Sequence, residues 1–235
     1  MKVLFLILAR HGSIRIPKKN SRAFYQANSL FDIAYEFCRS KDLPAYFEYD
    51  LLVSTNDASI QMALESKKNY NYRYERPEYL SGANTSSDAS AFHAIQWYMT
   101  NVGSFDYCVL MQPTSPLRTF EGFENFMYGV TDITRSYASV SRLKLKRREL
   151  VIKSGETFVR AFQSTKQVCN NEDYVFYEDG SYYCSSIHFI EKKGKFLDLG
   201  CLSYVLAEEQ EQIDIDTVEE FQTARKIYAM RIKTE

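Results

Sequence analysis

The sequence predicts an α/β fold, a three-layer sandwich with a mostly parallel sheet. Its first half contains three short apolar runs, at residues 3–9, 50–55 and 107–112, with helical patterns between them. Such runs are typical of strands that are buried on both faces of a parallel sheet. Strands that alternate with helices form right-handed βαβ units, which place helices on both faces of the sheet.

The helical spacing of apolar residues predicts the helices. The pattern is clear at residues 30–38 and 60–64 and less regular at 89–96. The Asn-Asp pair at 56–57 follows the second strand and favours a helix start there. A last helix is predicted at residues 218–228, and we expect it to pack back on the sheet.

From about residue 135 the pattern becomes that of antiparallel strands. Residues 137–145 alternate between apolar and polar side chains. Two further segments resemble hairpin strands around turn-forming pairs: 151–162 around 154–155, and 182–190 around 179–180. An antiparallel segment attached to a parallel sheet often covers a site or forms a subunit interface, so we expect a dimerisation insertion at about 135–190.

The composition limits the class of protein. The chain has 235 residues, of which 45% are hydrophobic, enough for a single domain spanning 1–235 that includes the insertion. Its 29 Lys and Arg balance 30 Asp and Glu, which argues against nucleic acid or a membrane surface as partner. Five cysteines without a Cys-x-x-Cys pair suit reduced thiols. No apolar run approaches the roughly 20 residues that span a bilayer, so we expect a soluble, cytoplasmic protein.

The first candidate functional motif follows the first predicted strand. Arg10, Arg15, Lys18 and Lys19 fall within ten residues, in a turn that also contains Gly12 and Ser13. Backbone N–H groups in such a turn converge on an anion, and the cations offset its charge. Ligands of open α/β sheets bind beyond the carboxyl ends of strands. The motif therefore predicts a phosphate site, and the alternative is a solvated basic loop.

The second motif, residues 112–118, follows the third strong strand. Two prolines fix the backbone and remove N–H donors, so the loop is predicted to be rigid. In the functional interpretation, Gln112, Ser115 and Arg118 face the same crevice as the basic loop. The alternative is a stiff crossover connection that happens to contain hydroxyl groups.

The third motif is the Asp-Ile-Asp sequence before the last predicted helix. Residues two apart in an extended segment point to one face, so Asp214 and Asp216 project together. Two carboxylates suit Mg²⁺, which takes one or two of them together with substrate phosphates and water. The alternative is that Asp216 is the N-cap of the helix, with Glu219 completing a capping box.

Together these motifs resemble the acylneuraminate cytidylyltransferase family, whose members make CMP-sialic acid and CMP derivatives of related nonulosonic acids. The matching stretches follow in the family's order along most of the chain: residues 9–20, 53–55, 76–80, 112–118 and 214–216. The resemblance implies a Rossmann-like nucleotidyltransferase fold. It also implies an enzyme in which a sugar hydroxyl attacks the α-phosphate of CTP and pyrophosphate leaves.

The resemblance also implies roles for individual residues. The catalytic residues would be Arg10, Lys19, Asp214 and Asp216. The nucleotide would be bound by Ala9, Arg10, Gly12, Ser13, Lys19, Asn20, Arg76 and Ser87. Asp214 and Asp216 would hold Mg²⁺, which neutralises charge as the phosphoryl oxygens become more anionic.

The acceptor, a sialic-acid-like sugar acid, would be bound by residues from two segments. Gln112, Ser115 and Arg118 would contribute from the loop after the third strand, and Arg147 from a basic cluster in the insertion. For that cluster a solvated basic turn is an equal alternative. The resemblance further suggests a homodimer in which the insertion reaches the partner subunit.

The chain departs from the family pattern at three places. One is Asp179-Gly180-Ser181, where the family commonly has Asn-Gly-Ala before an aromatic-rich strand. Ile14 stands where the family usually has lysine, and the acidic stretch 170–173 stands where arginines suited to a substrate carboxylate are usual. Two alternative functions therefore stay open. One is a glycosyltransferase that uses an Asp-x-Asp metal site to consume a nucleotide sugar, and the other is a non-catalytic nucleotide-binding homologue.

Overall fold

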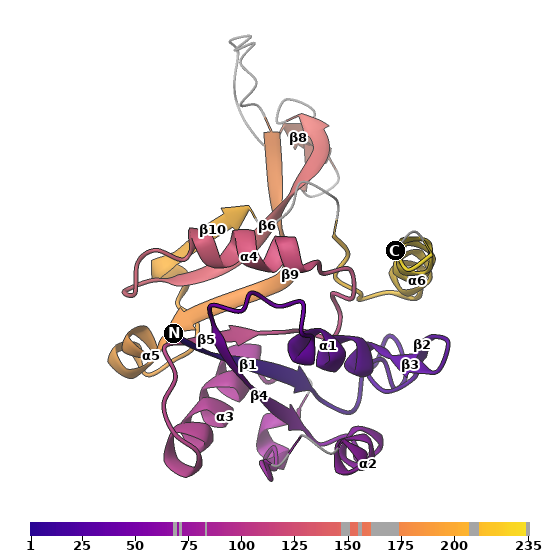
Figure 1. The fold of residues 1–235 in the computed structure, drawn as a ribbon. Coiled ribbons are helices and arrows are strands. Elements are labelled where there is room, and N and C mark those ends of the chain that lie inside the picture. The colour runs from indigo at the N-terminus through magenta and orange to yellow at the C-terminus, as the bar shows by residue number, and fades with distance from the viewer. Residues whose placement is uncertain are drawn as a thin grey trace.

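The computed structural model describes residues 1–67, 70, 72–82, 84–146, 151–154, 157–160, 174–206 and 212–233. Its centre is a six-stranded sheet with the order β10-β6-β9-β5-β1-β4 (Figure 1). The strands are β1 (Lys2–Ala9), β4 (Glu48–Thr55), β5 (Tyr107–Leu110), β6 (Ser136–Lys146), β9 (Tyr174–Ser186) and β10 (Leu202–Leu206). Neighbouring strands pair in parallel, except that β9 is antiparallel to both β5 and β6. The predicted mostly parallel sheet is confirmed.

Helices cover both faces of this sheet, which makes the three predicted layers. One face packs against α1 (Leu30–Arg39), α2 (Ala58–Ser66) and α4 (Phe120–Gly129), and the other against α3 (Ser87–Asn101) and α5 (Ile187–Lys193). The side chains of β1 alternate between the two cores: Phe5 belongs to the first and Leu6 to the second, and both are fully buried. This two-sided burial is why the strand is a continuous apolar run.

The predicted strands and helices of the first half are confirmed, with small differences in their ends. Asp57 is the N-cap of α2, as the Asn-Asp pair indicated. In the described residues the structure adds elements for which no prediction was made. They are α4, β10, a small ribbon of β2 (Ala23–Tyr25) and β3 (Asn28–Ser29), and the short 3-10 helices η1 (Glu78–Leu80) and η3 (Leu199–Cys201).

The predicted antiparallel pattern of the second half is confirmed for β9, whereas β10 and β6 pair in parallel. The predicted turn at Asp179 and Gly180 is wrong. β9 continues through both residues, and they form a bulge. Ala138 of β6 pairs with Tyr183, whereas Val140 pairs with Glu178, so extra residues of β9 are accommodated there. Gly180 has φ +70°, a conformation that glycine adopts without strain. The turn-forming pair therefore serves a bulge instead of a hairpin.

The predicted strand at 182–190 ends earlier than expected. Its last residue is Ser186, whose hydroxyl caps α5 by accepting from the Phe189 N–H. Much of β6 and β9, within residues 135–190, belongs to the central sheet. Beyond the sheet, β6 and β9 extend toward an antiparallel hairpin of β7 (Val151–Ser154) and β8 (Thr157–Arg160) (Figure 1).

The last helix, α6 (Val218–Arg231), forms as predicted but does not pack on the central sheet. Its Phe221 and Ala224 lie in a separate core cluster with Ile16, Phe24 and Leu30. Figure 1 shows α6 at the side of the molecule, beside the β2–β3 ribbon. The expectation that this helix covers the sheet is therefore wrong, because the basic loop and the ribbon provide the apolar surface that it buries.

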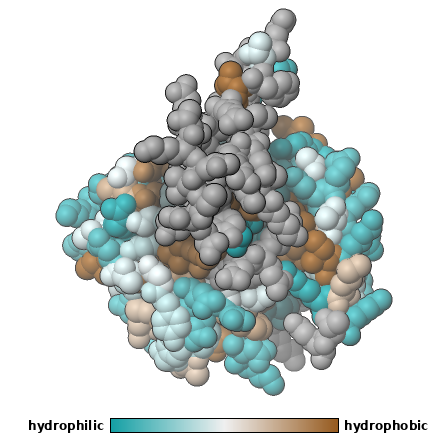
Figure 2. Space-filling model, turned by 90° about the horizontal axis from the view of Figure 1, so that it is seen from above, coloured by the Kyte–Doolittle hydropathy of each residue, from teal (hydrophilic) through white to brown (hydrophobic). Residues whose placement is uncertain are grey.

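The described cysteines Cys38, Cys108, Cys184 and Cys201 are free thiols, and Cys169 lies outside the described residues. Burial raises the pKa of Cys38 to about 12. No helix in the described part of the chain is long and apolar enough to cross a membrane. Seen from the side of the hairpin, hydrophobic residues form separate patches among hydrophilic ones (Figure 2).

Candidate active site

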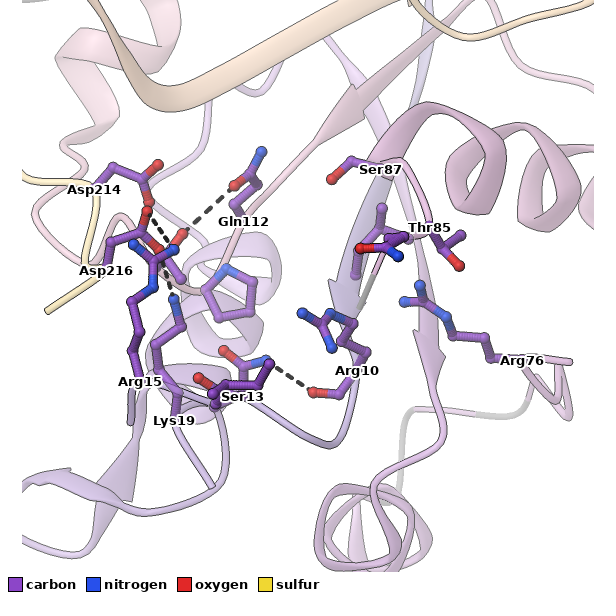
Figure 3. Close-up of a pocket in the computed structure, with 16 residues that line it drawn as sticks. Arg10, Ser13, Arg15, Lys19, Arg76, Thr85, Ser87, Gln112, Asp214 and Asp216 are labelled. Atoms are coloured by element: carbon purple, nitrogen blue, oxygen red, sulfur yellow. Dashed lines mark hydrogen bonds and ion pairs between the residues drawn. The ribbon is translucent and has the colours of Figure 1, made fainter. Parts of the chain in front are cut away.

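A cleft of about 570 Å³ lies at the carboxyl ends of β1 and β5 (Figure 3). The two strands are parallel neighbours, so the segments that follow them leave the sheet at the same edge. Arg10 follows β1 and Gln112 follows β5, and both side chains line the cleft. The topology thus brings together two motifs that are about a hundred residues apart in the chain.

The basic loop forms one wall of the cleft. Arg10, Ser13, Arg15 and Lys19 line it, whereas Lys18 is not among the lining residues. Short-range backbone hydrogen bonds shape the loop, for example from Lys19 N–H to the Ile16 carbonyl at 3.1 Å. The loop therefore presents three of its four cations to one space.

The other predicted residues near this wall differ in their access to the cleft. Asn20 lines the cleft and donates from Nδ2 to the Arg10 carbonyl at 3.4 Å, while its Oδ1 is buried without a hydrogen-bond partner among the described residues. Ala9 is fully buried in the sheet core. Gly12 has φ +85° and shapes the turn. Neither Ala9 nor Gly12 is among the lining side chains.

Arg76 and Ser87 lie on the opposite side of the cleft, together with Thr85 (Figure 3). The Arg76 guanidinium is buried and donates from Nη2 to the Leu80 carbonyl at 2.5 Å and to the Ser90 hydroxyl at 2.7 Å. Burial lowers the pKa of Arg76. These bonds fix the guanidinium at the cleft.

The two aspartates line the cleft near Gln112, across from Arg76 (Figure 3). Between them Ile215 is fully buried, and its N–H donates to the Thr114 carbonyl at 2.8 Å. This bond holds the Asp-Ile-Asp segment against the loop that follows β5. Because side chains alternate in direction along an extended segment, Asp214 and Asp216 point toward the cleft while Ile215 points away from it.

Asp216 forms ion pairs with two cations of the basic loop. Its Oδ2 lies 3.0 Å from Nη2 of Arg15, and its Oδ1 lies 3.2 Å from Nζ of Lys19. Lys19 also donates to the Ile215 carbonyl at 2.6 Å. The aspartate segment and the basic loop are thus joined directly on one side of the cleft (Figure 3).

The predicted cap at Asp216 is wrong by one residue. The N-cap of α6 is Thr217, and Glu220, not Glu219, completes the capping box. Glu220 Oε2 accepts from the N–H groups of Asp216 and Thr217 at 2.7 and 2.8 Å. The Asp216 carboxylate is therefore not the helix cap and stays directed to the cleft.

Ser115 and Arg118 do not face the cleft, so this part of the prediction is wrong. The Ser115 side chain is fully buried. Arg118 donates to three carbonyl oxygens, those of Ser181 at 2.7 Å, Ser115 at 2.7 Å and Gln112 at 2.5 Å. Burial lowers its pKa. The guanidinium holds the loop to β9, a structural role. Arg147 lies outside the described residues.

Sequence reasoning missed several residues at the site. Thr85 and Asn84 line the cleft beside Ser87, at the start of α3, and no spacing or composition signal marked them. Ile14, noted only as a departure, also lines the cleft and is 82% exposed. The residues that support the basic loop from behind, Asn56 and Asp57, were interpreted only as a helix start.

The two carboxylates at the cleft can supply some of the ligands of Mg²⁺, but not a complete set. Among the described residues, no group of three or more His, Cys, Asp or Glu side chains forms a metal cage. Asp214 and Asp216 supply two carboxylates, and Mg²⁺ in proteins is usually held by one or two carboxylates with phosphates and water as further ligands. The pair therefore fits a magnesium ion that arrives with a phosphate-containing substrate.

Comparisons with known proteins identify the fold. No protein-family model matches the chain, and no curated protein matches it in sequence. A solved structure of CMP:2-keto-3-deoxy-manno-octonic acid synthetase complexed with CTP is similar, with TM-score 0.64 and 13% identity. That match covers 98% of this chain and all of the other.

Two further similar structures are also cytidyl-transferring enzymes by name. The 4-diphosphocytidyl-2C-methyl-D-erythritol synthase from Anaerococcus prevotii has TM-score 0.62 and 12% identity, over 97% of this chain and 96% of the other. The 2-C-methyl-D-erythritol 4-phosphate cytidylyltransferase from Francisella tularensis has TM-score 0.56 and 10% identity, over 95% and 98%. The chain therefore has the α/β nucleotidyltransferase fold.

Proposed function

We propose that this protein is a cytidylyltransferase that transfers CMP from CTP to an acceptor hydroxyl and releases pyrophosphate. The observation that carries the proposal is the cleft itself, where three cations of the basic loop face two carboxylates at the carboxyl ends of parallel strands. Cations suit a triphosphate, and a carboxylate pair suits the magnesium ion that accompanies it. The fold shared with three cytidyl-transferring enzymes supports the same activity.

The basic loop would bind the triphosphate. Arg10, Arg15 and Lys19 would offset its charge, and Gly12 and Ser13 would supply backbone donors. Because Arg15 and Lys19 already lie beside Asp216, phosphates bound to them would lie near the carboxylates. Asp214 and Asp216 would hold Mg²⁺, which when bound neutralises charge on the phosphoryl oxygens.

The opposite side of the cleft would bind the nucleoside. Arg76 is fixed by its bonds to Leu80 and Ser90, so it is oriented before a base arrives. A fixed guanidinium donates to carbonyl oxygens, and cytosine carries one next to its ring nitrogen acceptor. Asn20, on the basic-loop side, also lines the cleft and would contact the nucleotide from there.

The reaction needs no protein nucleophile. The acceptor oxygen forms a bond to the α-phosphorus, the bond from that phosphorus to the β-phosphate oxygen breaks, and pyrophosphate and a proton are released. Positioning and charge stabilisation carry most of the catalysis in such transfers. Gln112, at the end of β5 and beside the carboxylates, would orient the acceptor.

We further propose a nonulosonic or related 3-deoxy-ulosonic sugar acid as acceptor, reacting through its anomeric hydroxyl. The sequence motifs support this class, and one similar structure is named for such a sugar acid. The two other structures are named for methylerythritol derivatives. A test must therefore include both kinds of acceptor.

The test is a pyrophosphate-release screen with CTP, Mg²⁺ and a panel of sugar acids, with 2-C-methyl-D-erythritol 4-phosphate as the contrasting acceptor. Release with a sugar acid, and formation of its CMP derivative, is the expected result. Release only with the methylerythritol phosphate would overturn the acceptor class and keep the activity. If CTP binds but no acceptor releases pyrophosphate, the cytidylyltransferase proposal fails.

The same screen separates the two alternative functions. A glycosyltransferase would bind a nucleotide sugar and transfer its sugar without releasing pyrophosphate. A non-catalytic homologue would bind CTP with no turnover. In the latter case Asp216→Ala would change no rate.

We also propose a homodimer in which the segment beyond the sheet, around β7 and β8, contacts the partner subunit. The projection of this hairpin from the molecule supports the idea (Figure 1). Sedimentation equilibrium should give a mass near twice 27.4 kDa. A monomer at all concentrations would defeat the proposal.

A further inference from the structure

We propose that Asn56 and Asp57, in the turn between β4 and α2, are positioning residues that hold the basic loop in the conformation that faces the cleft. Neither side chain is among those that line the cleft. Asn56 contacts the beginning of the loop from behind, and Asp57 contacts its end as well as His11. The catalytic consequence of this inference rests on the proposed function, whereas its structural consequence does not.

Asn56 holds the beginning of the loop. Its Oδ1 accepts from the His11 N–H at 2.8 Å. Just before these residues in each segment, the Thr55 hydroxyl donates to the Ala9 carbonyl at 2.6 Å. Ala9 and Thr55 are also partners in the parallel pairing of β1 and β4. The contact from Asn56 therefore continues the link between the two strands beyond the end of the sheet.

Asp57 holds the end of the loop. Its Oδ2 accepts from the Ser21 hydroxyl at 2.9 Å, and His11 Nδ1 lies 3.5 Å from the same oxygen. Its other oxygen, Oδ1, accepts from the Ser59 N–H at 2.9 Å and so caps α2. The carboxylate is buried, with the residue 3% exposed. One oxygen thus serves the helix and the other serves the loop.

These contacts fix the two ends of the loop with two consecutive residues. Between His11 and Ser21 lie the residues that face the cleft, including Arg15 and Lys19. Like charges in one loop repel each other and favour spread conformations, and ordering a loop on binding costs conformational entropy. A loop that is anchored at both ends before the ligand arrives loses less entropy on binding.

The direct test compares Asn56→Leu with Asn56→Asp. Leucine has a similar shape and no acceptor, whereas aspartate keeps an oxygen for the His11 N–H. Hydrogen–deuterium exchange of the protein alone should show about fivefold faster exchange in residues 11–21 of N56L, since such a hydrogen bond contributes about 1 kcal/mol. N56D should exchange like the wild type.

The matched control is Asn101→Leu. Asn101 also makes one side-chain hydrogen bond, to the Trp97 carbonyl at 2.7 Å, but it lies at the end of α3 away from the loop. N101L should leave exchange in residues 11–21 unchanged. Equal exchange in N56L, N56D and the wild type would overturn the proposal.

A second variant keeps the test decisive if N56L does not fold. Ser21→Ala removes only the hydroxyl that Asp57 Oδ2 accepts from and leaves the β4–α2 turn intact. It should speed exchange at the end of the loop. Unchanged exchange there would contradict the role of Asp57.

The kinetic test depends on the proposed activity. N56L and S21A should raise the KM for CTP about fivefold, with a smaller effect on the KM for the acceptor, because the loop would contact CTP and not the acceptor. If the protein shows no turnover, the proposed function fails while the exchange experiment still decides the role of Asn56 and Asp57. Faster loop exchange with unchanged KM for CTP would limit the role to structure and overturn the catalytic part.

Discussion

The Asp216 carboxylate lies between two cations. Removing its charge should therefore weaken the use of Mg²⁺ but should not weaken the binding of CTP without metal. Arg15 and Lys19 approach its two oxygens at 3.0 and 3.2 Å. Asp216→Asn removes one proposed metal ligand, so Mg²⁺-dependent turnover should fall about a hundredfold or more. The cations lose their anionic neighbour, so CTP without metal should bind as well as before or more tightly.

Steady-state kinetics and calorimetric titration of CTP, with and without Mg²⁺, measure the two effects of D216N. The control is Glu219→Gln, which removes the same charge from an exposed residue that is not among those lining the cleft. If D216N and E219Q have equal effects, the metal role of Asp216 is wrong.

Arg118 tests the difference between a binding residue and a structural one. Its guanidinium donates to three carbonyl oxygens of the loop and of β9. Lysine cannot reproduce a planar fork, so Arg118→Lys should lower the free energy of unfolding by about 2–4 kcal/mol. Urea unfolding measures this change. An unchanged unfolding free energy with a raised KM for the acceptor would restore the substrate-binding interpretation.

At the scale of elements, the sequence predicts best where burial is uniform along an element. β1 is buried on both faces, so its apolar run is continuous and its place in the sheet could be predicted. β9 and α5 were mispredicted because Asp179 and Gly180 have the composition of a hairpin turn but form a bulge. The mostly apolar residues 187–190 suit a strand or a buried helix equally. The helix is recognised only from its cap, the Ser186 hydroxyl.

The bulge in β9 also has a predicted effect on the site. A Cβ at Gly180 would lie 3.1 Å from Asp214 Oδ2 and 3.1 Å from Ser115 Oγ, and φ is +70°. Gly180→Ala should therefore strain the backbone by about 1 kcal/mol and also displace Asp214. We expect a higher Mg²⁺ concentration for half-maximal turnover.

The matched control for that variant is Gly194→Ala. Gly194 has φ +66° at the end of α5, and a Cβ there would meet nothing within 4 Å. Both variants should lose similar stability in urea unfolding, but only G180A should change the Mg²⁺ dependence. An equal Mg²⁺ dependence in both would show that Asp214 does not depend on the bulge.

At the scale of the whole molecule, the sequence could predict that the motifs lie together at the cleft, but it could not predict the contacts between their side chains. The strand ends bring Arg10 and Gln112 together because β1 and β5 are parallel, and this follows from the fold class. The ion pair of Arg15 with Asp216 joins residues about two hundred apart, and no local pattern encodes it. The packing of α6 on the basic loop, through Ile16 and Phe221, places the aspartates there.

The base of the sheet, at the end opposite the cleft, is held by a half-buried carboxylate that should make stability depend on pH. Asp50 of β4 accepts from the hydroxyls of Tyr72 and Tyr98, the latter at 2.6 Å, and from its neighbour Leu51 N–H at 2.8 Å. Lys2 lies 3.7 Å away. Burial alone would raise the pKa of Asp50, but these hydrogen bonds and Lys2 outweigh it, and the pKa lies below its ordinary value.

Because the pKa of Asp50 is lower in the folded protein than in the unfolded chain, its contribution to stability is complete above the unfolded value of about 4 and is lost as the pH falls through the folded value. Asp50→Asn should therefore lower the free energy of unfolding by about 1–3 kcal/mol near neutral pH. The difference from the wild type should shrink below about pH 4. Urea unfolding over this range measures it, with the exposed Asp42→Asn as control. If the unfolding free energies of D50N and the wild type instead change in parallel with pH, the tyrosines and Lys2 do not stabilise the charged form of Asp50, and the prediction is wrong.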